Sequence, residues 1–348
     1  MTSMVISYPI TIVVKIFLSY FIIFYCPMFN GLIKPVNLIL AGYSYLKSSA
    51  LKRAFIFGMP PAIGIELTNH CNLRCPECAS GSGAMKRERG FMDIELFNKI
   101  ISQLRPYLWN INLYFQGEPL LHPAFSSFIK NCGSIKSVIS TNGHFLSVEN
   151  SEKIVKSGLG KLIISLDGFN QETYSAYRIG GNVETVLEGI RNISVAKKSH
   201  KSSLKIEIQI LVNRLNEHQI PQMRKLAAEF NASLKLKSMQ IISRNSFETW
   251  LPGRSKFRRY EINDGAYTIR NKLPGRCARL WLNPVVSWNG KVLPCCFDKD
   301  ADHVMGDLNQ ESFNEIWNGS KYRLFRRLLL TDRSTIEICR NCSSGLRV

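Results

Sequence analysis

Apolar and polar residues repeat in a strand-then-helix order from Ala62 onward. Short apolar or alternating runs rich in β-branched residues predict six strands. The six runs are residues 62–67, 111–115, 137–140, 162–167, 204–212 and 234–239. Apolar residues at helical spacing lie between them, and Asp93 and Asn182 each precede such a stretch as typical N-cap residues. The pattern predicts an α/β fold, a parallel sheet with helices outside it, that has too few units for a complete eight-fold barrel.

The amino-terminal stretch departs from this order. Residues 9–29 are apolar apart from Lys15, and about 20 such residues are needed to span a bilayer. A charge inside the stretch disfavours insertion, so three alternatives stay open: a spanning helix, an interfacial helix and a helix buried against the protein body. The basic residues that follow would keep the rest of the chain on the cytoplasmic side of a membrane.

Composition and charge narrow the class of protein. The chain has 348 residues, 45% hydrophobic and 20% charged, which suits a large core and about two domains. A net charge of +19 favours anionic partners, but the basic residues are spread along the chain. No zinc-finger, RRM or KH signature is present, so no nucleic-acid partner is expected. No cleavable signal peptide is recognisable before the ten cysteines, which favours reduced, metal-binding thiols in the cytoplasm over secreted disulfides.

Three of these cysteines lie within eight residues, in the loop after the first predicted strand. Cys71, Cys75 and Cys78 have the spacing C-x3-C-x2-C. Thiolates hold both zinc and iron–sulfur clusters, but a closed zinc site needs a fourth ligand, and no further Cys or His follows nearby. Three protein ligands on a four-iron cluster leave one iron open to another molecule. A zinc loop or three unrelated core cysteines are the alternatives.

This triplet in this position resembles the signature of the radical SAM superfamily. In that family the triplet holds a [4Fe–4S] cluster that binds S-adenosylmethionine inside a partial (β/α)6 TIM-like barrel, and the six predicted units match such a barrel. The resemblance implies reductive cleavage of S-adenosylmethionine to a 5′-deoxyadenosyl radical, which abstracts hydrogen from a substrate. It also implies an electron donor such as flavodoxin or ferredoxin.

Segments at three predicted strand ends resemble the cofactor contacts of the family. Residues 116–119, Gln-Gly-Glu-Pro, are similar to its Gly-Gly-Glu motif, with Gln in place of the first Gly. The segments after the third and fourth strands resemble those that meet the ribose and carboxylate of the cofactor. The implied contacts are Gly117, Glu118, Pro119, Ser140, Asn142, Ser165 and Asp167. Simple turn formation is the alternative for each segment. Glu77 stands where many members carry an aromatic residue near the adenine.

The last seventy or so residues carry a second set of cysteines. Asn289-Gly290 between two β-rich runs predicts a hairpin that could return the chain so that Cys295 faces Cys277. With Gly290 five residues before Cys295, the set resembles the shortened SPASM (twitch) extension of radical SAM enzymes, which holds one auxiliary [4Fe–4S] cluster. The implied ligands are Cys277, Cys295, Cys339 and Cys342, with Cys296 as a spare thiol. A zinc ribbon is the alternative.

The predicted organisation therefore has four parts. Residues 1–59 form an apolar amino-terminal segment and lead-in, and residues 60–243 form the radical SAM core. Residues 244–273, which are rich in Arg, predict a linker or a substrate-facing loop. Residues 274–348 form a small β-hairpin-plus-helix iron–sulfur domain.

The substrate does not follow from these motifs. Many peptide maturases carry an extra peptide-binding domain before the triplet, where this chain has about seventy largely apolar residues. We therefore expect a small molecule of the sugar or cyclitol type, altered by a two-electron oxidation or another modification. A peptide maturase is one alternative, and a non-catalytic metal-stabilised binding protein is another. The expected location is the cytoplasm, with contact to the inner membrane surface through the amino-terminal segment.

Overall fold

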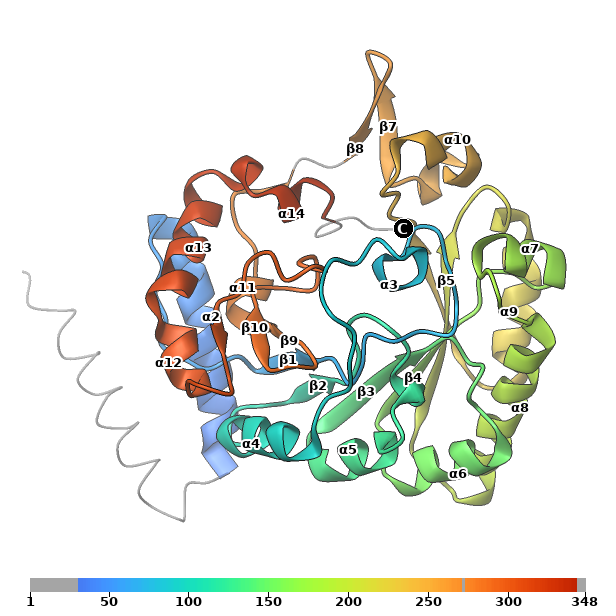
Figure 1. Ribbon diagram of the computed structural model, residues 1–348, viewed down its shortest axis with the longest axis horizontal. Helices are drawn as coiled ribbons and strands as arrows, with labels where there is room; N and C mark the ends of the chain where they lie inside the picture. The colour runs from blue at the N-terminus through green and yellow to red at the C-terminus, as the bar shows by residue number, and fades with distance from the viewer. Residues whose placement is uncertain (1–30, 271–272, 343–348) are drawn as a thin grey trace, which may run out of the picture.

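The computed structural model describes residues 31–270 and 273–342 (Figure 1). Six parallel strands lie in chain order within one sheet. They are β1 (Ala62–Ile65), β2 (Asn110–Asn112), β3 (Lys136–Thr141), β4 (Lys161–Ser165), β5 (Lys205–Val212) and β6 (Ser233–Ser238). The helices between them are α3 (Ala79–Ser82), α4 (Ile94–Leu104), α5 (Phe125–Cys132), α6 (Val148–Lys156), α7 (Gln171–Tyr177), α8 (Val183–Ser199) and α9 (Ile220–Glu229). The predicted α/β fold with a partial (β/α)6 barrel is confirmed.

The core forms where the strands meet the covering helices. Ile139, Leu162 and Ile208 on the strands are fully buried and share one hydrophobic cluster with Phe97 and Phe128 from the helices. Both predicted caps are present as well. The side chain of Asp93 accepts hydrogen bonds from the backbone at the start of α4, and that of Asn182 does so at the start of α8. These caps fix where the helices begin against the sheet.

The predicted Asn-Gly hairpin forms and extends the same sheet. Strands β9 (Val285–Val286) and β10 (Lys291–Leu293) are antiparallel, and Gly290 has φ +84° in the turn between them. Strand β9 also pairs in parallel with β1, and β11 (Gly306–Asp307) pairs with β10. The sheet order is therefore β11-β10-β9-β1-β2-β3-β4-β5-β6. The carboxyl-terminal hairpin is built directly onto the barrel sheet.

Residues 244–270, within the segment predicted as a linker or substrate-facing loop, contain regular secondary structure. They include α10 (Phe247–Trp250) and an antiparallel hairpin of β7 (Tyr260–Asn263) and β8 (Ala266–Ile269), which projects from the body in Figure 1. Phe247, Trp250 and Tyr260 form a small second core with Leu73 and Cys75 of the cysteine-triplet loop. Burial of these aromatic side chains explains the order of a stretch whose surface is basic.

The amino-terminal helix α2 (Ile33–Leu51) and the segment that follows it pack against the carboxyl-terminal part of the chain. The indole nitrogens of Trp281 and Trp317 donate to the carbonyls of Phe55 and Gly58, each at 3.0 Å. The helices of this part are α11 (Arg279–Leu282), α12 (Phe313–Asn318), α13 (Ser320–Thr331) and α14 (Glu337–Arg340). The apolar stretch 9–29 lies outside the described residues. No helix within the described ranges has the length and hydropathy needed to cross a membrane.

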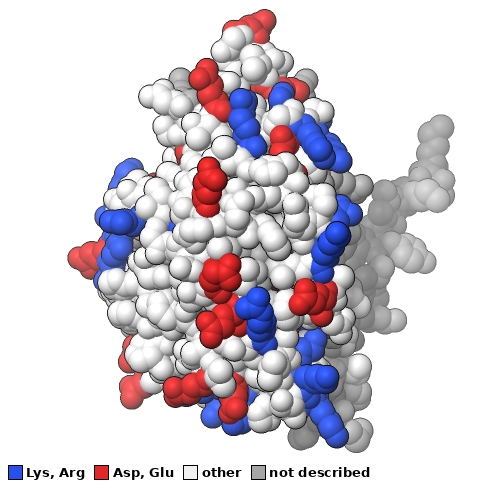
Figure 2. Space-filling view, turned by 90° about the vertical axis from the view of Figure 1, so that its right-hand side faces the viewer, with Lys and Arg blue, Asp and Glu red and all other residues white. Residues whose placement is uncertain are grey.

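The basic surplus is not gathered on the face formed by the right-hand side of Figure 1. Figure 2 shows that lysines and arginines there are interspersed with acidic residues. The net charge of +19 therefore gives no single basic patch on this face.

Candidate functional site

The cysteine triplet follows strand β1 in a loop that its neighbours hold closely. Cys75 is buried, whereas Cys71 and Cys78 are half-buried. Burial, with smaller contributions from neighbouring thiols of the triplet, raises the pKa of Cys71 and raises that of Cys75 to about 11. Three thiolates this close together need positive charge beside them, which iron ions provide. The donor set therefore suits an iron–sulfur cluster.

A cation that the sequence reasoning missed lies against this triplet. Arg178, just after α7, pairs with the fully buried Asp167 through N–O distances of 2.6 and 2.7 Å. Its Nη1 lies 3.9 Å from the Sγ of Cys75. Burial alone would lower the pKa of Arg178, but Asp167 and Cys75 hold it well above its usual value. Asp167, predicted as a cofactor contact, thus also orients a permanent positive charge beside the cluster loop.

The turn after β2 is fitted against the same loop. Gly117 has φ +75°, and a Cβ there would lie 2.6 Å from the Cα of Asn69 and the carbonyl oxygen of His70. The next amide, that of Glu118, donates to the carbonyl of His70 at 2.8 Å. Only glycine allows this approach, so the turn and the triplet loop form one unit, with Pro119 buried directly behind them.

The carboxylate of Glu118 is fully enclosed by protein donors. It accepts from the Thr141 hydroxyl at 2.7 Å and from the amides of Asn142 and Leu120 at 2.6 and 3.0 Å. Burial raises the pKa of Glu118 to about 7, although these hydrogen bonds act to lower it. Glu118 therefore fastens the turn after β2 to the turn after β3.

The remaining predicted contacts lie at the same edge of the sheet. The amide nitrogen of the Asn142 side chain donates to Asn72 at 2.7 Å and lies 4.0 Å from the Sγ of Cys71. Ser140 is half-buried near the end of β3, and Ser165 is buried at the end of β4. The carboxyl ends of adjacent parallel strands bring all of these side chains to the mouth of the barrel.

Glu77, where the family often has an aromatic residue, has a structural partner. Its carboxylate accepts from the amides of Ile242 and Ser243 at 2.5 and 3.3 Å. The triplet loop is thereby tied to the chain that leaves β6.

The second cysteine set gathers from three separate segments. The four buried thiols are Cys277, Cys295, Cys339 and Cys342. Burial holds the pKa of Cys295 well above its usual value, and Cys296, Cys277 and Cys342 raise it further. Burial likewise raises the pKa of Cys339, and its neighbours Cys342 and Cys277 add to the rise. Cys277 and Cys342 each act on both Cys295 and Cys339, so the four buried thiols lie in one region, which suits a closed cluster site.

Two further observations bear on which kind of metal centre these cysteines could hold. The spare thiol of Cys296 accepts from Arg279 at 2.9 Å. In the described part of the chain, no three His, Cys, Asp or Glu side chains converge on the position of a single ion. In a four-iron cluster each thiolate binds a different iron, so ligands need not converge on one point.

A buried ion pair between the two cysteine sites was also missed from sequence. Glu66, at the end of β1, binds Arg87 through distances of 2.5 and 2.7 Å and accepts from the amides of Gln116 and Trp288. Arg87 also donates to the carbonyl of Lys299 at 2.7 Å, just beyond the second cysteine set. The pair therefore connects the end of β1, the segment after α3, the turn after β2 and the carboxyl-terminal hairpin. Its only sequence signal was an acidic residue inside an apolar run.

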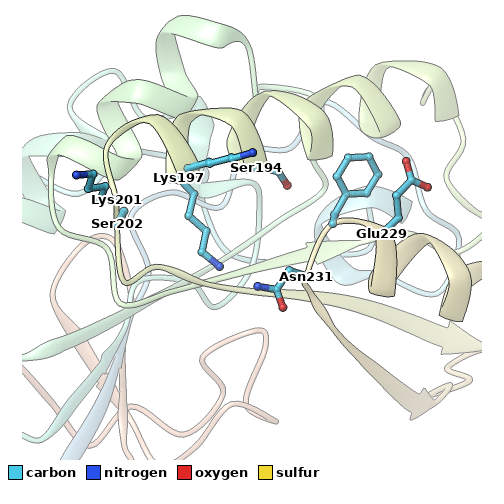
Figure 3. Close-up of a pocket in the computed structure, with 8 residues that line it drawn as sticks. Ser194, Lys197, Lys201, Ser202, Glu229 and Asn231 are labelled. Carbon is cyan, nitrogen blue, oxygen red and sulfur yellow. The ribbon is translucent and has the colours of Figure 1, made fainter.

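The hollow in Figure 3 lies elsewhere. It has a volume of about 390 Å³ and is lined by residues that include Lys197, Lys201 and Asn231. These residues precede the starts of β5 and β6, at the opposite edge of the sheet from the triplet. Lysines at the end of α8 complement the helix dipole, so the hollow has a structural explanation.

Two family models match the chain. One, described as radical SAM superfamily, matches residues 65–227, and one described as an iron-sulfur cluster-binding domain, SPASM, matches residues 277–343. The chain belongs to the radical SAM superfamily and carries a SPASM domain. It is therefore an enzyme that uses S-adenosylmethionine and [4Fe–4S] clusters.

Some curated relatives match most of the chain, but at low sequence identity. The chain is 24% identical over 290 residues to the S-adenosyl-L-methionine-dependent 2-deoxy-scyllo-inosamine dehydrogenase of Niallia circulans, covering 81% of this chain and 92% of that one. It is also 24% identical over 313 residues to the tungsten-containing aldehyde ferredoxin oxidoreductase cofactor-modifying protein of Pyrococcus furiosus, covering 80% and 86%. The match to the GTP 3′,8-cyclase of Limosilactobacillus fermentum is 27% identical over 194 residues, and the chain spans only 56% of that relative.

Solved structures show the same fold. Streptococcus suis SuiB bound to S-adenosylmethionine has a TM-score of 0.62 at 14% identity, over 88% of this chain and 76% of that one. BtrN in complex with AdoMet and 2-DOIA has a TM-score of 0.51 at 20% identity, over 82% and 94%. At this identity the likeness concerns the fold alone.

Proposed function

We propose that this radical SAM enzyme carries out a two-electron oxidation of a small polyhydroxylated molecule of the sugar or cyclitol type. The observation that carries the proposal is the gathering of four buried thiols at a site separate from the triplet, which suits one auxiliary cluster able to accept an electron. The extensive similarity to a dehydrogenase of an inosamine supports the substrate class. When bound and reduced, the cofactors supply a 5′-deoxyadenosyl radical that takes a hydrogen atom from the substrate.

We assign the predicted residues to two cofactor sites on this basis. Cys71, Cys75 and Cys78 would hold the cluster that binds S-adenosylmethionine, and the carboxyl-terminal set would hold the auxiliary cluster. The residues assigned to S-adenosylmethionine are Gly117, Glu118, Pro119, Ser140, Asn142, Ser165 and Asp167. The corresponding parts of the chain are residues 60–243 and 274–348, joined by residues 244–273.

The chain's own residues would position these groups. Arg178, oriented by Asp167, balances negative charge beside Cys75. Glu118 and Gly117 lock two strand-end turns against the triplet loop, which keeps the binding surface preorganised. The small second core packs on Leu73 and Cys75 and would shield that side of the loop from water.

A peptide substrate is the second candidate function. The chain is 26% identical over 194 residues to the mycofactocin maturase of Mycobacterium tuberculosis, although it spans only 47% of that protein. Anaerobic assays of the reconstituted enzyme with a panel of cyclitols and amino sugars would test the first function. Oxidised product in step with 5′-deoxyadenosine supports it, whereas turnover of only a short peptide would favour maturation.

Two partners complete the proposal. A flavodoxin or ferredoxin would supply the electron to the triplet cluster. Helix α2 would contact the cytoplasmic membrane surface, because Leu38, Ile39 and Leu46 are exposed while Asn37 and Ser44 are buried. Sedimentation with anionic vesicles tests this contact, and an Ile39→Glu/Leu46→Glu variant should lose most of the bound fraction. Equal sedimentation of variant and parent would remove the membrane contact from the proposal.

A further inference from the structure

On β4, β5 and β6, the face of the sheet turned away from the helices carries several polar and charged side chains. Lys161 of β4 and Glu207 of β5 bridge this face at 2.7 Å. On the edge strand β6, Lys235 and Lys237 are exposed and lie opposite Gln209 and Leu211, while the alternate leucines of β6 pack toward the core on the other face. The interior of a closed barrel is normally filled by bulky branched side chains, so this inner face calls for another occupant. We call Tyr114, Lys161, Glu207, Lys235 and Lys237 the inner polar cluster.

The cluster carries more positive than negative charge. Lys161 already holds the carboxylate of Glu207. Lys235 and Lys237 are two residues apart on one strand and one face, so their ammonium groups repel each other. Burial lowers the pKa of Lys237, and Arg279 and Lys235 lower it further, while Glu207 and Cys296 act in the opposite direction. Among the described residues near Lys237, one paired carboxylate faces several cations, so an anionic ligand would relieve the repulsion.

Hydrogen-bond donors and the place of the cluster suit such a ligand. Burial raises the pKa of Tyr114 to about 12, with Cys296 and Glu207 contributing, so its hydroxyl stays a donor at neutral pH. Gln209 pairs with Ser165 on one side and Lys235 on the other. Its buried Oε1 is an acceptor without a hydrogen-bond partner in the described part of the chain, and it would suit a hydroxyl of the substrate rather than the anionic group. The cluster thus adjoins the strand end that we assign to S-adenosylmethionine.

We propose that the inner polar cluster binds the phosphoryl group of a small substrate, with Lys237 and Lys235 as charge partners and Tyr114 as a hydrogen-bond donor. Lysine is a common point-charge partner for phosphate, and a phosphoryl group accepts several hydrogen bonds at once. The proposal rests on the function proposed above and narrows its substrate to a phosphorylated polyol or sugar. The competing explanation is that lysines on the edge strand β6 only prevent pairing with another sheet.

Calorimetric titration of the reconstituted protein with inorganic phosphate tests this directly. We expect saturable binding that weakens at least about tenfold in Lys237→Met and less in Lys235→Met, because Met keeps the stem and removes the charge. Lys237→Arg should retain binding, which keeps the test informative if Met perturbs the fold. The matched control is Lys197→Met, at the distant hollow of Figure 3, and it should bind as the parent does.

Three outcomes would overturn the assignment. They are absence of saturable binding to the parent protein, unchanged binding in Lys237→Met, and an equal loss in Lys197→Met. A parallel titration with acetate identifies the anion, and binding of acetate as tight as that of phosphate would replace the phosphoryl group by a carboxylate. None of these titrations depends on S-adenosylmethionine cleavage. Failure of the proposed function would instead appear as absence of oxidised product in the assays with cyclitols and amino sugars.

Discussion

The two cysteine sites differ in how the chain builds them. The triplet comes from one short loop, two of its three cysteines are half-exposed, and Arg178 lies beside it. The second set comes from three segments that are far apart in sequence, and all four of its thiols are buried. The first site is thus local and open on one side, as a site that must admit a second molecule has to be. The second is closed and joins distant parts of the chain, as a structural or electron-accepting site would.

The open site should lose its chemistry completely when its ligands are removed. Replacing Cys71, Cys75 and Cys78 with Ala should abolish S-adenosylmethionine cleavage and reduce reconstituted iron from about eight to about four per chain. Because the loop is local, the fold should survive, which a circular-dichroism melt can check. Cleavage of S-adenosylmethionine by this variant would contradict the assignment of the radical cluster to the triplet.

The buried ion pair between Glu66 and Arg87 should contribute strongly to the stability of the fold. Glu66→Gln leaves the Arg87 guanidinium buried without its counter-charge, since Glu66 is fully buried and Arg87 nearly so. Losing one partner of a buried pair typically costs about 3 kcal/mol or more in unfolding free energy. Urea denaturation measures the loss.

The control for this prediction is an exposed pair of similar length. Glu152→Gln breaks the surface contact with Lys156, and we expect no measurable change in unfolding. If Glu66→Gln also left the unfolding free energy unchanged, the Glu66–Arg87 ion pair would not be a source of stability for the region that it connects.

A smaller effect should appear as a pH dependence centred on Glu118. Its pKa is raised from 4.5 to about 7 in the folded protein, so the folded state binds more protons than the unfolded chain between these values. Stability from this group is therefore greatest at low pH and falls as pH rises toward about 7. Between about pH 5.5 and 7.5 the loss should be about 2 kcal/mol. Glu118→Gln should flatten this part of the profile, and an unchanged slope would show that another group is responsible.

Sequence was sufficient wherever a local pattern determined the structure. Buried parallel strands are built from apolar runs, Asp93 and Asn182 cap the starts of α4 and α8, and Asn289-Gly290 suits a two-residue turn, so each could be predicted. The pairing of β9 with β1 could not be predicted, because it joins residues more than two hundred positions apart in the sequence. Either of these short strands could have paired with another strand.

Side-chain roles at the mouth were harder to predict for a related reason. Arg178 follows a short helix with nothing local to mark it, and only the fold brings it to Asp167 and Cys75. Glu118 was expected near the cofactor from its motif, but its three donors come from two different turns. Long-range packing decides such partners.

The contrast between the open and the closed site is tested most directly by changing Cys339 and Cys342 to Ala. This removes two of the ligands that we propose for the second site and none of those that we propose for the triplet site. The reconstituted variant should still cleave S-adenosylmethionine without substrate, while substrate turnover should fail. A melt by circular dichroism must accompany the assay, because closed metal sites often contribute to folding. A folded variant with full substrate turnover would contradict the account and leave these two cysteines as structural ligands at most.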